Sequence, residues 1–187
     1  MTSKELRLKG LILIETKLFH DERGFFTEHY KKEAYSALGL PEFVQDNHSR
    51  SKPGVLRGLH YQTGPHAQGK LVSVIRGRIW DVAVDIRKDS PTYGQWEAIE
   101  LSGENGLQLW IPPGFAHGFC VLGDEDADVF YKVDRVYAPG NEVGIIYNDP
   151  QLKIEWPLKN LIISEKDSKL PSFNQSQFID RDKTRRQ

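Results

Sequence analysis

Short runs of residues that favour β-strands recur along the chain, and turn residues separate them. Closely spaced runs of this kind, with no long amphipathic helix between them, predict an all-β sandwich or barrel. Glycine and proline occupy the breaks, as tight turns between antiparallel strands require. The jelly roll is the all-β architecture that fits this rhythm best. The predicted strands are residues 11–15, 25–30, 55–62, 71–75, 79–86, 96–101, 107–111, 129–135 and 144–147.

One short helix is predicted at residues 32–38, where the pattern ends at Gly39 with Pro41 just beyond. A helix of this length cannot form a layer, so we expect it at the periphery of the fold. The 187 residues, 39% of them hydrophobic, are enough for one substantial core, which predicts a single domain over residues 1–187. Residues 181–187 are nearly all polar with alternating charge, which predicts a mobile tail.

The charged residues exclude several classes of partner. The formal net charge is -1 and is spread along the chain, whereas nucleic-acid and membrane-surface proteins concentrate basic residues on one face. The first apolar run, residues 11–14, is too short for a signal peptide or a membrane span, so we expect a cytoplasmic protein. The single cysteine, Cys120, lies in an apolar run, which predicts a buried hydrophobic residue rather than a nucleophile.

Two segments combine glycine with histidine: residues 54–62, which contain His60, and residues 112–119, which contain His117. They resemble the two cupin motifs, which implies a cupin-type jelly-roll barrel. In metal-binding cupins the first motif supplies two histidines and a glutamate, and the second supplies one more histidine. Here Gln62 stands in place of the second histidine, and no carboxylate follows before Lys70. Two of the four metal ligands are therefore missing, which disfavours a metal site.

A histidine inside a barrel can still act as a base, because an unperturbed imidazole has a pKa of about 6.5 and is largely neutral at cytosolic pH. From the residues alone, a hydrogen-bonded core histidine is an equal alternative for His60. Tyr131 shares a strand face with Val129 and Val133, where it would be either a proton donor or a packing tyrosine. Lys70 would either stabilise an enolate oxygen or lie on a solvated rim, and the residues alone favour the rim.

Arg57 raises a question of geometry. Strict alternation along residues 55–62 places Arg57 and His60 on opposite faces of their strand. Both side chains could serve one pocket only if a bulge or twist occurs at Gly58. The sequence therefore predicts an irregularity at this glycine if the two residues share a site.

An ordered series of segments resembles the dTDP-4-dehydrorhamnose 3,5-epimerase family of cupin-fold sugar-nucleotide enzymes over nearly the whole chain. The segments are residues 21–26, 45–49, 55–60, 68–72, 81–85, 110–112, 114–119, 131–132 and 164–167. The resemblance implies an epimerase that inverts C3 and C5 of dTDP-4-dehydro-6-deoxyglucose in dTDP-rhamnose biosynthesis. Both carbons are α to the C4 ketone, so removal of a proton leaves an enolate and no cofactor is needed. Base and acid must then flank the sugar ring.

The resemblance implies four catalytic residues. His60 would be the base, and Asp167 would orient its imidazole, although Asp167 by itself has the appearance of a surface carboxylate. Tyr131 would be the acid on the opposite face, and Lys70 would hold the enolate oxygen. The implied substrate contacts are Arg57 and His117 to phosphate, Arg23, Glu28, Gln45, Asn47, Glu142 and Lys166 to the nucleotide or sugar, and Phe19 stacking on the base.

The resemblance further implies a homodimer in which Arg23 reaches across to the other subunit. Three alternatives stay open. Relatives that keep the same catalytic residues invert only one carbon of a related sugar. A metal-dependent cupin could use His60, His66 and His117, although His66 by itself is more simply a solvated loop histidine. A non-catalytic binding module for nucleotide sugars would keep the pocket without the chemistry.

Overall fold

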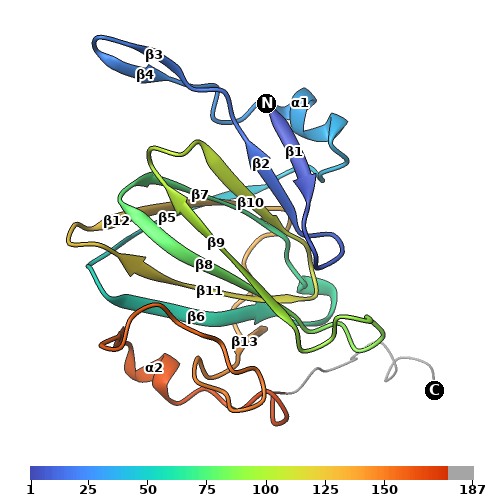
Figure 1. Ribbon diagram of the computed structural model, residues 1–187. Helices are drawn as coiled ribbons and strands as arrows, with labels where there is room; N and C mark the ends of the chain where they lie inside the picture. Colours follow the sequence, from blue (N-terminus) through green and yellow to red (C-terminus); the bar gives the residue numbers. More distant parts are fainter. Residues whose placement is uncertain (177–187) are drawn as a thin grey trace.

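The computed structural model describes residues 1–176, which form two largely antiparallel β-sheets packed face to face (Figure 1). In spatial order, the first sheet contains β1 (Thr2–Glu5), β2 (Ile12–Glu15), β10 (Leu107–Ile111), β7 (Lys70–Arg76), β12 (Ala127–Val133) and β5 (Gln45–Ser51). The second contains β13 (Glu142–Gly144), β6 (Val55–Gln62), β11 (Phe115–Leu122), β8 (Arg78–Asp85) and β9 (Trp96–Ser102), with β14 (Ile162–Ile163) added in parallel to β6.

The order of the strands identifies the architecture. The chain passes repeatedly from one sheet to the other, since β5, β7, β10 and β12 of the first sheet alternate along the sequence with strands of the second. Such crossing between two antiparallel sheets is the connectivity of a jelly roll. The predicted all-β, cupin-type jelly-roll fold is therefore confirmed.

The core lies between the two sheets. Val72, Leu109 and Val129 of the first sheet pack in one cluster with Ile79 and Val121 of the second, and all five are fully buried. Burying an aliphatic side chain of this size stabilises the fold by about 1.5–3 kcal/mol. The polar positions that interrupt this apolar interior are therefore the ones that need a chemical explanation.

Helices contribute little to the fold. α1 (Lys32–Ala37) agrees with the predicted peripheral helix to within one residue, and η1 (Gly64–His66) is a single 3-10 turn. The sequence patterns did not predict α2 (Glu165–Ser168). It begins after Ser164, whose Oγ accepts a hydrogen bond from the backbone N–H of Asp167 at 3.0 Å, a typical N-cap. Among residues 1–176, no helix is long and apolar enough to cross a membrane.

A two-stranded hairpin, β3 (Phe19–Asp21) and β4 (Gly24–Phe26), projects from the sandwich as an arm (Figure 1). Its three phenylalanines, Phe19, Phe25 and Phe26, expose 49%, 41% and 66% of their surface. Apolar side chains gathered on a projecting segment usually mark an interaction surface. The arm therefore offers a contact surface that the other residues of the described range 1–176 leave uncovered.

Most differences from the predicted strands have a local cause. The strand predicted at residues 55–62 is β6, and Cys120 is buried as predicted. β5 was missed because its sequence, Gln45–Ser51, contains no apolar residue. It is an edge strand that pairs only with β12, so it can be polar on its outer face. The prediction over residues 25–30 is too long, since β4 ends at Phe26.

β13 also differs from its prediction, because it covers Glu142–Gly144 rather than residues 144–147. All three residues of β13 pair with the end of β6, which brings Glu142 opposite Gln62. The tail predicted at residues 181–187 lies outside the described residues.

Candidate active site

A β-bulge in β6 gives the site its shape. Phe119 of β11 pairs with Arg57, but His117, two residues earlier, pairs with His60, so β6 carries one extra residue at this point. Gly58 lies in the bulge with φ +108°, and a Cβ atom there would be 2.6 Å from the carbonyl oxygen of His117. The extra residue places Arg57 and His60 on the same side of the strand. The irregularity predicted at Gly58 is confirmed.

The bulge makes Gly58→Ala a strongly destabilising change. The new methyl group combines an unfavourable φ with a clash against backbone atoms, and we expect a loss of about 3 kcal/mol in the free energy of unfolding. Gly140→Ala is the matched control, since Gly140 has φ +84° and open space around its Cβ position. Urea denaturation of both variants measures the difference. Equal losses in the two variants would show that the close approach of a Cβ atom at Gly58 to the His117 carbonyl oxygen does not affect stability.

His60 forms a hydrogen-bonded pair with Asp167. The imidazole Nε2 lies 2.7 Å from Oδ1 of Asp167, and Oδ2 accepts the backbone N–H of Gly58 at 3.2 Å. Asp167 is only 4% exposed. Burial by itself raises the pKa of this carboxyl, but the His60 contact and the Gly58 and Ser164 hydrogen bonds outweigh it and lower the pKa overall.

The ionised Asp167 determines which His60 nitrogen can act. A carboxylate only accepts hydrogen bonds, so the nitrogen facing it, Nε2, carries the proton in the neutral imidazole. Nδ1 then holds the free lone pair and is the basic atom. The Asp167 carboxylate also stabilises the imidazolium that forms when Nδ1 takes up a proton. This arrangement is that of a general base with its orienting carboxylate.

Lys70, the first residue of β7, lies in the cavity next to His60 rather than on a solvated rim. The rim position favoured by the residues alone is therefore wrong. Burial lowers the pKa of Lys70 from 10.5 to about 8, against the opposing effects of Glu142 and Asp81. The residue before Lys70 must be a glycine, because a Cβ atom at Gly69 would lie 2.2 Å from the Trp110 ring.

The lowered pKa of Lys70 predicts an alkaline limit to activity. The ammonium is present below about pH 8 and is lost as the pH rises through that value, so kcat/KM for an enolate-forming reaction should fall above it. Lys70→Arg keeps the cation at every accessible pH. We expect this variant to be slower but free of the fall near pH 8. If kcat/KM of Lys70→Arg still falls near pH 8, a group other than Lys70 causes the fall.

Tyr131 faces His60 from the other sheet. It lies on β12 of the first sheet and packs against the core, whereas His60 lies on β6 of the second. Burial and Glu142 raise the pKa of the Tyr131 phenol, and Arg57 partly opposes them. The phenol therefore stays protonated at neutral pH. Side chains of the two sheets line one cavity: Gln45, Asn47, His60, Tyr61, Gln62, Gln68, Lys70, Tyr131, Tyr137 and Glu142.

A base and an acid that face each other across a cavity suit proton transfer at both faces of one carbon atom. The sandwich itself supplies this geometry, because each sheet contributes one of the two groups. A protonated Lys70 in the lining of the same cavity can stabilise a developing oxyanion. The arrangement is that of a site for proton abstraction α to a carbonyl.

His117 forms a second buried pair. Its Nε2 lies 2.8 Å from Oδ2 of Asp81, and the two residues are 7% and 0% exposed. The other carboxylate oxygen of Asp81 has no hydrogen-bond partner among residues 1–176. His117 pairs in register with His60, so it lies on the strand next to the base. Its contact with phosphate stays a prediction.

The model of the dTDP-4-dehydrorhamnose 3,5-epimerase family matches residues 5–175. The chain belongs to this family. The dTDP-4-dehydrorhamnose 3,5-epimerase of Shigella flexneri is 52% identical to it over 94% of each chain. Residue identity at this level over nearly the whole length means that the two chains share one fold and one arrangement of elements.

Two solved structures show the range of the epimerase family. The dTDP-6-deoxy-D-glucose-3,5-epimerase of Legionella pneumophila, in complex with dTDP-4-keto-L-rhamnose, is 51% identical with a TM-score of 0.89 over 93% of both chains. A 3'-monoepimerase from Streptomyces bikiniensis, in complex with dTDP-quinovose, is 32% identical with a TM-score of 0.83. That comparison covers 90% of this chain and 86% of the other. By their names, the first enzyme inverts two carbons and the second inverts one.

Three residues expected to contact substrate in this epimerase-family chain lie away from the cavity. Arg23 and Phe19 belong to the arm, where the Arg23 side chain is 85% exposed and bonds to Asp21. Glu28 follows the arm and is also exposed. None of the three lines the cavity of its own subunit. Their contacts with substrate stay predictions.

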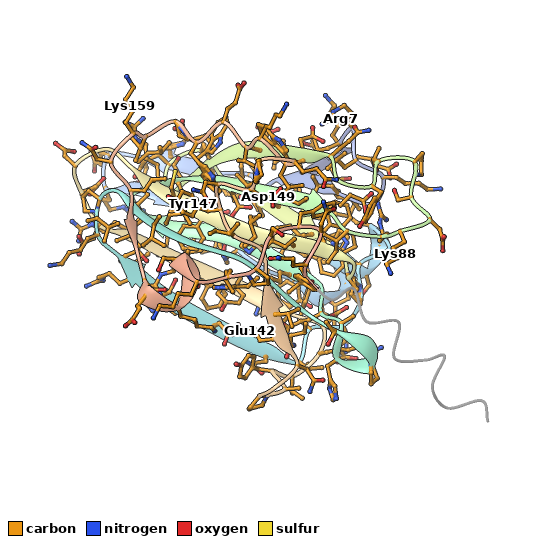
Figure 2. The ribbon with its side chains drawn as sticks, turned by 90° about the horizontal axis from the view of Figure 1, so that it is seen from below. Arg7, Lys88, Glu142, Tyr147, Asp149 and Lys159 are labelled. Carbon is orange, nitrogen blue, oxygen red and sulfur yellow. The ribbon has the colours of Figure 1, made fainter. Side chains whose placement is uncertain are left out.

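The other expected contacts lie at or next to the cavity. Gln45 and Asn47 line it and share a 2.9 Å hydrogen bond. Glu142, labelled on β13 in Figure 2, also lines it and forms an ion pair with the exposed Lys166. Arg57 donates to Ser51 Oγ at 2.8 Å. Their contacts with substrate stay predictions, but Gln45, Asn47 and Glu142 share the cavity with His60 and Tyr131.

Sequence reasoning gave no role to Asp81. It shares one face of β8 with the buried Ile79 and Ala83, so it points inward among apolar residues. A carboxylate at an inward position of a predicted strand is a signal that the sequence contains. The partner that explains it, His117, comes from a different strand and could not be read from that pattern.

Neither a metal site nor the hollow beside Arg87 offers an alternative acid–base site among the described residues. Within residues 1–176, no three His, Cys, Asp or Glu side chains are grouped so that they could hold a metal ion. His66 lies on η1 and does not line the cavity that contains His60. A larger hollow of about 960 Å³, bordered by Arg87 and Lys88, contains no histidine in its lining.

Proposed function

We propose that this chain is a dTDP-4-dehydrorhamnose 3,5-epimerase, which inverts C3 and C5 of dTDP-4-dehydro-6-deoxyglucose. The observation that carries the proposal is the placement of the His60–Asp167 pair and Tyr131 on facing sheets around one cavity. Family membership and the names of the similar enzymes support the substrate. The product is dTDP-4-dehydro-L-rhamnose.

The first step is proton abstraction. His60 Nδ1 removes the proton from C3 or C5, and the electron pair of that C–H bond moves into the C4 carbonyl as an enolate. The Lys70 ammonium stabilises the enolate oxygen. Asp167 stabilises the imidazolium, and its own carboxyl stays ionised because its pKa is lowered.

The second step is protonation from the other face. The Tyr131 phenol donates its proton to the same carbon, the C4 carbonyl re-forms, and the configuration is inverted. Tyr131 is left as a tyrosinate and His60 as an imidazolium. The His60 side chain is 23% exposed, so water can exchange protons with the pair and reset it for the second carbon.

The same proposal includes a cytoplasmic homodimer in which each chain is a single jelly-roll domain. The uncovered phenylalanines of the arm support dimerisation, and the distance of Arg23 and Phe19 from their own cavity supports their action across the interface. Phe19 would stack on the thymine in the partner's site, whereas Arg57 would hold the diphosphate in the site of its own subunit. Size-exclusion chromatography with light scattering tests the oligomeric state directly.

Isotope exchange tests the function. In deuterated water with dTDP-4-dehydro-6-deoxyglucose, we expect the enzyme to place deuterium at both C3 and C5, as measured by NMR of the product. The similarity to a 3'-monoepimerase makes inversion of a single carbon the second candidate, and deuterium at one position only would identify it. Exchange at neither carbon would reject an epimerase of this substrate.

A further inference from the structure

Gln62 lies next to the base but has no part in the proton transfers. It follows His60 by two residues on β6, so both side chains point to the same face of the strand. Both line the cavity that contains Tyr131 and Lys70. Gln62 is only 7% exposed. Glutamine side chains are mostly exposed, so a buried one is expected to form hydrogen bonds at both the oxygen and the nitrogen of its amide.

One end of the Gln62 amide is fixed by the backbone. Its Oε1 accepts a hydrogen bond from the N–H of Ala138 at 2.8 Å. Within the side-chain amide only the oxygen can accept a hydrogen bond, so this contact determines the positions of the amide oxygen and nitrogen. The NH2 group therefore points away from Ala138, and its nitrogen is buried without a hydrogen-bond partner among residues 1–176.

A buried donor without a partner is rare in folded proteins, because it has lost its hydrogen bonds to water and gained none in return. Beside an acid–base cavity, the simplest explanation is that a ligand supplies the missing acceptor. Glu142 pairs in register with Gln62 across β13 and β6, so its carboxylate lies on the neighbouring strand at the same level. Glu142 pairs with Lys166 rather than with the Gln62 amide.

An NH2 donor beside a carboxylate acceptor matches a hydroxyl group, which both accepts and donates. Successive residues on one strand face are about 7 Å apart, comparable to the width of a hexose ring with its substituents. A sugar whose C3 or C5 lies at His60 therefore has ring oxygens within reach of residue 62. Neither the nucleoside nor the diphosphate fits beside the base, where the reacting carbons must lie.

We propose that Gln62 is a further substrate-binding residue, whose Nε2 donates a hydrogen bond to a hydroxyl or carbonyl oxygen of the sugar and holds the ring against His60. This inference rests on the proposed function, because it takes the sugar nucleotide as the ligand. Gln62 also borders the hollow of about 960 Å³ beside Arg87 and Lys88. Strand alternation places its side chain on the His60 side.

The test compares two ligands that differ only in the sugar. Isothermal titration gives the dissociation constants of dTDP and dTDP-quinovose for the wild type, Gln62→Met and Gln62→Glu. Methionine keeps the volume and removes the whole amide. Glutamate keeps an oxygen for the Ala138 N–H and removes the amide hydrogens. The ratio of the two constants isolates the sugar contact in Gln62→Met, since a general change in folding acts on both ligands and this variant adds no charge.

We expect the ratio to shift about fivefold against dTDP-quinovose in both variants, the loss of one neutral hydrogen bond. An unchanged ratio in both variants would overturn the proposal. A shift in Gln62→Met alone would also overturn it, because the residue would then act only by holding Ala138. If the wild type binds neither ligand, the proposed function itself fails, whereas wild-type binding of both with unchanged ratios rejects Gln62 alone.

Discussion

His60→Ala should abolish isotope exchange at C3 and C5 of the substrate, with a fall in kcat of about 10⁴-fold, at the upper end of what a general base contributes. The change removes the group that the proposed mechanism assigns to take the proton, while the cavity and its other polar side chains remain. Deuterium incorporation measured by mass spectrometry reports abstraction at each carbon. Incorporation at the wild-type rate would exclude His60 as the base.

Asp167→Asn is a second test of the base, through the carboxylate that orients it. Its amide has the same shape as the carboxylate, but it can donate a hydrogen bond to Nε2 and so favour the tautomer whose Nδ1 carries the proton. We expect a fall in kcat comparable to that of His60→Ala with little change in the affinity for dTDP. Full activity in this variant would show that Asp167 only supports the structure around Gly58 and Ser164.

Tyr131→Phe should separate abstraction from inversion. The variant keeps His60 but loses the donor on the opposite face, so the imidazolium returns a solvent-derived proton to the face from which it came. Inversion should fall by about 10²–10⁴-fold, while deuterium still enters the recovered substrate. NMR of the substrate and product pools measures both rates in one experiment.

The control for Tyr131→Phe is Tyr137→Phe. Tyr137 lines the same cavity but is 46% exposed and lies outside the two sheets, so its phenol is less constrained. We expect a smaller effect on inversion from this change. A larger effect at Tyr137 than at Tyr131 would move the acid to the segment that follows β12. Equal inversion by Tyr131→Phe and the wild type would leave Tyr131 as a packing residue.

Hydrophobic periodicity predicted strands whose signal lies within one segment, but it did not predict strands that depend on pairing with a distant segment. Hydrophobic periodicity placed β6 at residues 55–62 and put Tyr131 on the same face as two buried valines, because alternation is a local property of a strand. The same local reasoning missed β5, which has no apolar residue and is held only by its pairing with β12. Strand pairing is a tertiary interaction, so its signal lies in another part of the chain.

The candidate site shows the same division. Motif resemblance drew attention to His60, Lys70, Tyr131 and Asp167, and the structure brings all four to one region. The structure also shows that Lys70 lines the cavity, whereas the residues alone favoured a solvated rim, because its burial depends on residues far away in sequence. The expected action of Arg23 across a dimer stays a prediction, and the structure places this residue on the projecting arm with its side chain 85% exposed.

By itself the sequence determined the all-β class, the strand that carries His60, the absence of the usual metal-ligand pattern, and the need for an irregularity at Gly58. These follow from residue types and from spacing within single segments. Only the tertiary structure decided that Asp167 is buried against His60, 107 residues away, and that acid and base come from facing sheets. Such pairings depend on how the strands stack, and no local pattern encodes the distance between two sheets.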